Sequence, residues 1–455
     1  MRVSIYHRFF IQFVCNPRTA RIGSKYYEVP SWYDYVYLSL FMSLKDRTVS
    51  LLRWSEKYTK TDMVYLAQSN FWLQAISIFV SFASFLLYIV FGHVLSKEVY
   101  GTYQYLLSIG AIVGAFTLTG MSTAVTRAVA RGYEGTFRES IRVQLLWSII
   151  PLLGSWAFGG YYLLHANATL GWGLVLIGIF VPFNSTFNTY GAYLLAKKDF
   201  RRAFLYNLFN NAPYYISVAL IAVSLPVALA LLAANLISQA IGFFIAYKKT
   251  LAVYQPNENR DPEAMSYGKQ LSFINALTTV IAQVDSILVF HFLGAAELAL
   301  YSFSTAIPDR LGIFKNIAAA AFPKFANKTH EDIRTSLIHK LLLSIVVALG
   351  IALLYDIFAH SFFLLFFPLY LSAVPYTQAY AFIIAATFGS LFTTALTAHS
   401  RVKALYIYNI LAPLFLLACE IVGILLGGLW GLIIARVVGA FFSSLLTLGL
   451  FWFSV

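Results

Sequence analysis

The sequence predicts an all-α integral membrane protein with twelve transmembrane helices in two six-helix bundles. Of its 455 residues, 60% are hydrophobic and only 11% are charged, and the mean hydropathy is +0.72. A soluble globular chain carries about 25% charged residues, so this chain cannot cover a water-facing surface. In addition, apolar runs of about 20 residues, the length that spans a bilayer core, recur from residue 70 to residue 453. These observations exclude a soluble globular protein.

Twelve apolar runs account for the predicted helices. Several contain Gly or Pro, which membrane helices tolerate better than soluble helices do. The runs are 70–92, 102–126, 143–165, 170–195, 203–223, 226–247, 267–293, 297–322, 337–358, 374–398, 404–426 and 429–453.

Basic residues occupy alternate loops between these runs, so the net charge of +13 reflects topology rather than nucleic-acid binding. One set of loops is rich in Lys and Arg, whereas the alternate set, which includes a loop at 359–373, contains Lys97 alone. Short cytoplasmic loops accumulate Lys and Arg, and both termini are therefore predicted inside. The basic loops carry Arg127, Arg131, Arg138 and Arg142; Lys197, Lys198, Arg201 and Arg202; Lys248, Lys249, Arg260 and Lys269; Lys324, Lys328, Arg334 and Lys340; and Arg401 and Lys403.

The N-terminal segment, residues 1–69, is polar, basic and aromatic, and it lacks the apolar core of a signal peptide. Ser31–Lys60 alternates aromatic, aliphatic and charged residues, which fits either an amphipathic interfacial helix or a poorly ordered cytoplasmic tail. The two cysteines, Cys15 and Cys419, do not make a disulfide framework, and no metal-ligand cluster is present. We therefore expect no cofactor.

An internal repeat divides the chain. Leu95-Ser96 and Gly101-Thr102-Tyr103 recur 198 positions later as Leu293-Gly294 and Ala299-Leu300-Tyr301. Tyr206-Asn207-Leu208 likewise recurs as Tyr408-Asn409-Ile410. Six helices per repeat give two halves with the same orientation, as in some secondary transporters. The predicted division is a first bundle at 70–250, a cytoplasmic linker at 251–266 and a second bundle at 267–455.

Ionisable residues inside the predicted helices are functional candidates, because each costs about 2.5–3.5 kcal/mol at a helix centre. Asp285 either binds a coupling cation or a partner charge, or makes a structural hydrogen bond. Asp309 and Arg310 are adjacent, so they point about 100° apart on a helix. Arg310 is the preferred anion-binding candidate, because guanidinium matches phosphate oxygens; the alternative is an ion pair with Asp285 or Asp309.

Further polar residues lie deep in other runs. Lys315 either extends a cationic path or reaches the interface. Arg436 either lines a cavity or pairs with Glu420. Asn188 and Asn207 offer the neutral donors and acceptors that a sugar needs, or they form hydrogen bonds between helices.

Two patterns at matching places in the halves carry a family resemblance. The first half contains Val94–Tyr103 and Gly120–Arg127, and the second contains Asp285–Val289, Phe292–Gly294 and Leu300–Ser302. With them, residues 62–453 resemble the Wzx-like oligosaccharide flippases, the polysaccharide biosynthesis proteins of the multidrug/oligosaccharidyl-lipid/polysaccharide (MOP) export superfamily. This resemblance implies a MATE-like fold with a cationic cavity between two bundles.

The resemblance implies a function and partners. The expected function is to move an undecaprenyl-type, polyprenyl-pyrophosphate-linked oligosaccharide from the inner to the outer leaflet of the cell membrane, by alternating access and without covalent chemistry. The expected protein is a monomer that works beside a polysaccharide polymerase and glycosyltransferases. Two alternatives stay open: a MATE-type small-molecule exporter, and a membrane-embedded polymerase or ligase. The second is disfavoured because the 359–373 loop offers His360 as its only titratable side chain.

Overall fold

The computed structural model describes Arg53 and residues 63–311, 330–398 and 401–453. The chain divides into two compact units, residues 1–71 and 72–455. Of the first unit, the structure describes Arg53 and the residues that begin helix α3. The predictions for Ser31–Lys60 and Lys315 fall outside the described residues.

The described elements of the first half are all helices. Each predicted run corresponds to one helix or to two consecutive helices. Predicted run 102–126, however, is broken at 116–120 between α4 and α5. The helices are α3 (Met63–Val94), α4 (Lys97–Ala115), α5 (Met121–Ala130), α6 (Gly135–Trp147), α7 (Ile149–Leu164), α8 (Ala168–Asn188), α9 (Tyr190–Ala196), α10 (Phe200–Ser224) and α11 (Ala228–Tyr254).

Side-chain caps begin several of these helices where the sequence predicts turns. The Ser96 hydroxyl accepts a hydrogen bond from the Val99 N–H at 3.3 Å, and Asn167 accepts one from Leu170 N–H at 3.1 Å. Each cap satisfies a backbone donor that the first helical turn leaves free. The short connections therefore have a local cause.

The second half is also helical, with more interruptions. Predicted run 267–293 breaks between α12 and α13, and run 374–398 contains one 3₁₀ segment, η2. The predicted loop 359–373 is wrong, because α17 continues to Phe366 and a 3₁₀ turn follows. The elements are α12 (Ala264–Ile281), α13 (Val284–Leu293), α14 (Ala295–Leu311), α17 (His330–Phe366), η1 (Pro368–Ala373), α18 (Val374–Ala381), η2 (Phe382–Phe388), α19 (Gly389–Ala398) and α20 (Val402–Phe453).

Helix α20 is a helical hairpin that bends at Gly428. Gly428 has φ 56° and ψ −135°, a conformation open to glycine and strained for other residues. Across this bend, a Cβ on Gly423 would overlap the backbone of Gly431, and the rings of Phe415 and Phe442 stack at 3.8 Å. The chain therefore reverses at the turn predicted between runs 404–426 and 429–453.

Eight segments among the described residues are long and apolar enough to cross a membrane, and α20 counts as one of them. All-helical structure and multiple apolar spans confirm the predicted class, a multi-pass membrane protein. The count of twelve helices and the inside location of both termini stay predictions.

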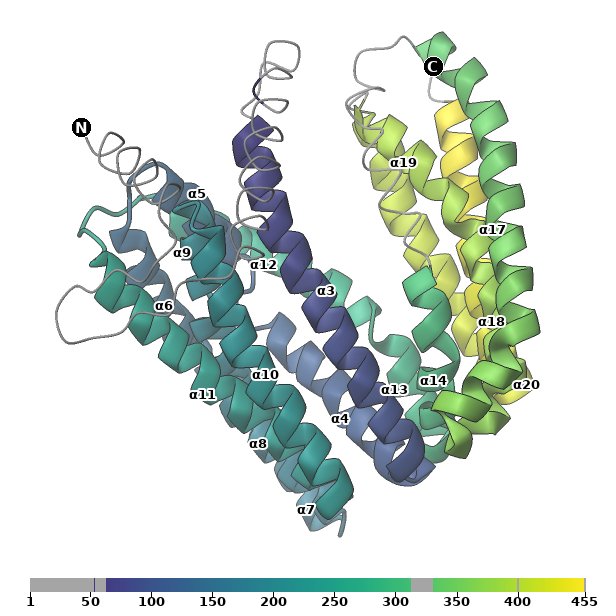
Figure 1. The fold of residues 1–455 in the computed structure, drawn as a ribbon, viewed down its shortest axis with the longest axis horizontal. Helices are drawn as coiled ribbons and strands as arrows, with labels where there is room; N and C mark the ends of the chain where they lie inside the picture. The colour runs from purple at the N-terminus through teal and green to yellow at the C-terminus, as the bar shows by residue number, and fades with distance from the viewer. Residues whose placement is uncertain (1–52, 54–62, 312–329, 399–400, 454–455) are drawn as a thin grey trace, which may run out of the picture. The chain divides into compact units, whose positions relative to one another are not determined.

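Helix packing joins segments that are distant in sequence. In the first half, α8 packs on α7 and α11, and α10 packs on α11 (Figure 1). In the second half, α17 packs on α18, and α19 packs on α20. The halves meet where α14 packs along α4 and where α12 packs on α4 and α5.

The contact between α4 and α14 is close because of one glycine. A Cβ on Gly101 would overlap the carbonyl of Ala295, so only glycine permits this approach of the two backbones. Beside it, the Tyr100 ring lies 4.9 Å from Phe303, whose ring stacks on Tyr370 at 3.8 Å. We call this contact, made by Tyr100, Gly101, Ala295, Phe303 and Tyr370, the aromatic seam.

The linker after α11 is attached to the first half. Asn257 Nδ2 donates to the Gly132 carbonyl at 3.0 Å, and the Asp261 N–H donates to Thr136 Oγ1 at 2.9 Å. In the same region, burial raises the pKa of Glu134, but hydrogen bonds from Lys197 and Tyr193 outweigh it and lower the pKa below its usual value. The linker therefore contacts the segment that connects α5 to α6, and Glu134 in this segment forms an ion pair with Lys197.

Candidate functional site

A charged cluster forms within the second half. Arg436 Nη1 lies 2.5 Å from Asp285 Oδ2 and 3.5 Å from Glu420 Oε1. The side chains of Asp285 and Glu420 are 8% and 4% exposed, and that of Arg436 is 22% exposed. The sequence favoured a pair between Arg436 and Glu420; the structure contains that pair and adds Asp285. One guanidinium is therefore shared by two buried carboxylates.

The break between α12 and α13 positions Asp285. Because α13 begins at Val284, the N–H groups of its first turn have no partner within the helix. Asp285 Oδ1 accepts a hydrogen bond from the Ser286 N–H at 2.6 Å. A helix N-terminus also favours a negative charge. The carboxylate is thus stabilised by backbone as well as by Arg436.

Two buried tyrosines extend the cluster to other helices. Tyr301 on α14 donates to Asp285 Oδ2 at 2.6 Å. Arg436 Nη2 donates to Tyr380 Oη on α18 at 3.3 Å, and that hydroxyl donates to Asp309 Oδ1 at 3.0 Å. The cluster of Asp285, Tyr301, Tyr380, Glu420 and Arg436 therefore joins α13, α14, α18 and α20.

The sequence reasoning missed both tyrosines as site residues. Tyr301 was visible as part of the Leu300–Ser302 pattern, and a buried phenol requires a hydrogen-bond partner. Tyr380 carries no such signal, because it stands in an aromatic stretch where many rings serve packing alone.

Arg310 contacts α3 and is not part of the charged cluster. It is exposed, its Nη2 donates to Ser84 Oγ on α3 at 3.1 Å, and its Cζ lies 5.6 Å from the centre of the Tyr88 ring. Among the described residues, no salt bridge to Arg310 is present, so the predicted alternative of a pair with Asp285 or Asp309 is not found. Arg310 thus extends from the second half towards α3, while its neighbour Asp309 contacts Tyr380.

The two asparagine candidates lie in different surroundings. Asn188 lines a cavity of about 440 Å³ within the first half. Asn207 donates to the Ala203 carbonyl of its own helix at 2.9 Å and does not line this cavity. The structure therefore does not bring the two amides together.

Metal-binding chemistry has no evident place in the described part of the chain. No group of three or more His, Cys, Asp or Glu residues there has the geometry of a metal site. The arrangement suits two roles. Arg310 beside α3 is a cation suited to binding, and Arg436 compensates the charges of two carboxylates among packed helices. Such features in a multi-pass helical protein are typical of membrane transporters.

Solved transporter structures share this fold. A lipid II flippase MurJ, in an inward closed conformation, matches with a TM-score of 0.63 and 13% identity over 83% of this chain and 86% of that chain. An inward-facing multidrug resistance MATE family transporter of the MOP superfamily matches at 0.62 and 15% over 81% and 92%. An outward-facing one matches at 0.52 and 14% over 86% and 94%. The chain therefore has the fold of the MOP superfamily.

The sequence also matches a family. The family model described as polysaccharide biosynthesis protein covers residues 90–346, more than half of the chain, and the protein belongs to this family. No curated protein matches the chain. The predicted resemblance to Wzx-like members of the MOP superfamily is thereby confirmed.

Proposed function

We propose that this protein is a flippase that moves a lipid-linked oligosaccharide from the inner to the outer leaflet of the cell membrane. The polysaccharide biosynthesis family and the MOP fold support a transporter for a polysaccharide precursor. The observation that carries the proposal is the environment of Arg310. Its guanidinium reaches from one half towards the other and makes no salt bridge with a described residue.

Arg310 is suited to a phosphate. A guanidinium has five N–H donors and binds phosphate oxygens in pairs, and the hydrogen bond to Ser84 uses one donor. The Tyr88 ring favours the cation without neutralising it. In the proposed mechanism, Arg310 offsets the charge of the lipid pyrophosphate, with Lys315 extending the cationic path, while the polyprenyl tail stays in the bilayer.

Arg436 has a different proposed role. Two carboxylates already occupy its guanidinium, so it holds α13 and α20 together rather than binding substrate. With Asp285 and Glu420 both ionised, these two carboxylates and the Arg436 guanidinium together leave one negative charge uncompensated. We propose that a proton or another cation compensates it during transport, with Asp309 joined through Tyr380. Outward movement of an anion also draws on an inside-negative potential, at about 2.3 kcal/mol per charge per 100 mV.

The remaining parts of the proposal follow from this role. The protein performs no covalent chemistry, acts in the cell membrane as a monomer, and receives its substrate from glycosyltransferases. A polysaccharide polymerase then uses the translocated product. The two six-helix bundles at 70–250 and 267–455 move against each other around the 251–266 linker.

Reconstitution into liposomes tests the function. With a fluorescent lipid-linked oligosaccharide, leaflet exchange should require the protein, and Arg310→Ala should slow it by about 10- to 100-fold, as expected for loss of hydrogen bonds to a charged group. Arg310→Lys should retain part of the rate, and Arg201→Ala, at an exposed position on α10, should retain all of it. If Arg310→Ala flips as fast as wild type, the proposed role of Arg310 is wrong.

The same liposomes test coupling. An imposed proton gradient should change the wild-type rate, and Glu420→Gln should abolish that change. If the gradient acts equally on wild type and Glu420→Gln, Glu420 does not carry the coupling proton.

A further inference from the structure

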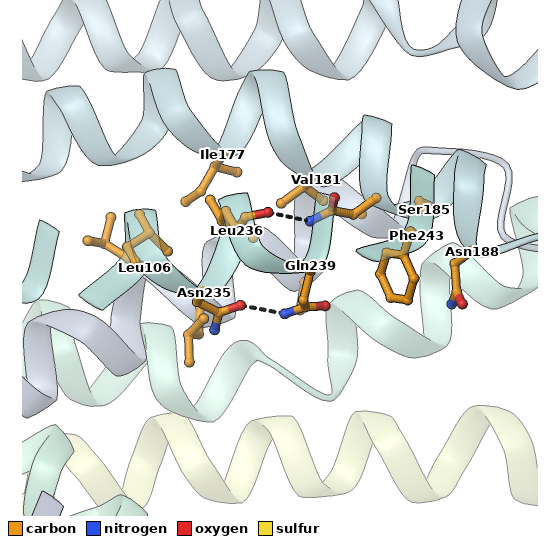
Figure 2. A pocket seen from close by; sticks show the side chains of 15 residues that line it. Leu106, Ile177, Val181, Ser185, Asn188, Asn235, Leu236, Gln239 and Phe243 are labelled. Atoms are coloured by element: carbon orange, nitrogen blue, oxygen red, sulfur yellow. Dashed lines mark hydrogen bonds between the residues drawn. The ribbon is translucent and has the colours of Figure 1, made fainter. Parts of the chain in front are cut away.

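The first half contains a partly open cavity whose lining includes polar side chains. Its volume is about 440 Å³, within the range of roughly 300–1,000 Å³ typical of small-molecule sites, and its walls come from α4, α8 and α11. Its polar lining consists of Asn184, Ser185, Asn188, Asn235 and Gln239, and we call it the amide cavity (Figure 2). Four side-chain amides in one cavity between membrane helices need an explanation.

Helix packing explains only some of their hydrogen-bonding groups. Asn235 Nδ2 donates to Tyr103 Oη at 2.8 Å. Its Oδ1 accepts from Gln239 Nε2 at 2.5 Å, as Figure 2 shows. Asn184 Nδ2 donates to the Leu236 carbonyl at 3.2 Å. These bonds fix the orientation of three of the four amides, Asn184, Asn235 and Gln239.

One buried acceptor is left over. Asn184 is 8% exposed, yet its Oδ1 has no hydrogen-bond partner in the described part of the chain. Leaving a buried acceptor unpaired costs free energy, so such groups normally have a partner in protein, water or ligand. The Asn184 side chain lines the cavity, so its carbonyl oxygen is an acceptor that the described part of the chain leaves for a donor from outside the protein.

The lining grades from exposed to buried. Asn188 is exposed, Ser185 and Gln239 are half-buried, and Asn184 and Asn235 are buried. A polar ligand thus meets polar side chains at both exposed and buried positions of the lining. A lipid chain gains nothing from these groups and would leave them unpaired.

The lining contains no titratable side chain, since its other members are Leu, Ile, Val, Ala, Gly and Phe. A charged ligand would enter without a counter-charge, which is unfavourable in a membrane-embedded site. Neutral amides paired with apolar walls and one aromatic ring, that of Phe243, suit a molecule with hydroxyl groups and C–H faces. These features suit a neutral carbohydrate.

We propose that the amide cavity binds a neutral glycosyl unit, with Asn184, Asn188 and Gln239 as its hydrogen-bonding residues. Naming this unit as the sugar of the transported lipid rests on the proposed function. The cavity lies within α4, α8 and α11 and contains neither Arg310 nor the charged cluster. Sugar binding and phosphate binding would therefore use different sets of residues.

Saturation-transfer NMR on the full chain in nanodiscs tests the proposal without transport. The probe is a free neutral N-acetylhexosamine disaccharide, and the same disaccharide with a hexuronic acid unit is the charged comparison. We expect the neutral probe to bind at least about fivefold more tightly than the acidic one. Asn184→Leu, Gln239→Leu and Asn188→Leu should each weaken its binding about fivefold or more, the effect of one lost hydrogen bond.

Asn211→Leu is the matched control, because Asn211 donates to the Asn207 carbonyl of its own helix and lies outside the cavity lining. It should bind like wild type. Asn188 is exposed, so Asn188→Leu tests the site even if Asn184→Leu fails to fold. Absence of binding, or equal binding by wild type and all three cavity variants, would mean that the cavity holds water alone or a lipid chain and would overturn the proposal.

The outcome is separable from that of the flipping assay. A chain that binds the disaccharide but does not flip lipid contradicts only the proposed function. A chain that flips lipid while its cavity variants bind the disaccharide unchanged contradicts only the carbohydrate site.

Discussion

Among the residues of the charged cluster, Arg436 should have the largest effect on stability when it is removed. It compensates two carboxylates that are each less than a tenth exposed, and its removal would leave both without a cation. A broken buried ion pair is costly chiefly because of the charge that remains, whereas a neutral replacement of the whole pair is often tolerated. The structural effect of Arg436 therefore depends on Asp285 and Glu420.

We predict that Arg436→Leu lowers the free energy of unfolding by about 3–5 kcal/mol. Denaturant unfolding in detergent, followed by tryptophan fluorescence, measures the change. The triple variant Arg436→Leu, Asp285→Asn and Glu420→Gln should recover most of the loss, because no buried charge is left. If the triple variant is as unstable as Arg436→Leu, packing rather than charge accounts for the effect.

The sequence predicted which charged residues lie within the apolar runs, but it did not predict how they are arranged. Asp285, Glu420 and Arg436 stand out because ionisable groups are rare in apolar runs. The sharing of one guanidinium by two acids depends on the bend at Gly428 and on the start of α13, which hydropathy does not report. Tyr380 was not found, because its partners come from α14 and α20.

At the level of elements, length and composition predicted the helices well and their interruptions poorly. The breaks at 116–120 and 282–283 contain only neutral residues within longer apolar runs, so hydropathy gives no sign of them. Loop 359–373 was predicted as the gap between runs 337–358 and 374–398, yet its first half continues α17. The turn at Gly427-Gly428, in contrast, was found because two glycines interrupt the pattern.

The hairpin of α20 leads to a second prediction. Gly423 and Gly431 let its two arms touch, and a Cβ on either would overlap the backbone of the other. We expect Gly431→Val to lower the free energy of unfolding by about 1–3 kcal/mol, as overpacking does. Gly449→Val is the control, because a Cβ there meets nothing within 4 Å. Equal destabilisation by the two variants would show that helix propensity, and not the glycine contact, is responsible.

Across the whole molecule, the backbone follows the internal repeat, whereas the charged and polar groups do not. Helices α4 and α14 occupy matching places in the two halves and pack on each other at the aromatic seam. Asp285 and Arg310, however, correspond to Leu87 and Ile112 in the first half. The seam thus joins equivalent elements, whereas the charged groups belong to the second half and the amide cavity to the first.

Alternating access requires the halves to part on each side in turn, and the aromatic seam is the contact that must open on the predicted outer side. Gly101→Val should force it apart, because its Cβ would overlap the Ala295 carbonyl. A cysteine at Ala299, one turn after Ala295 and fully buried, reports the opening. In a background with Cys15→Ser and Cys419→Ser, Gly101→Val should speed labelling of Ala299→Cys by a membrane-impermeant maleimide about tenfold or more. This change corresponds to a shift of about 1.4 kcal/mol between closed and open states.

The control is Gly160→Val, where a Cβ has open space, and it should leave labelling unchanged. Equal labelling with and without Gly101→Val would mean that the seam does not control access from that side.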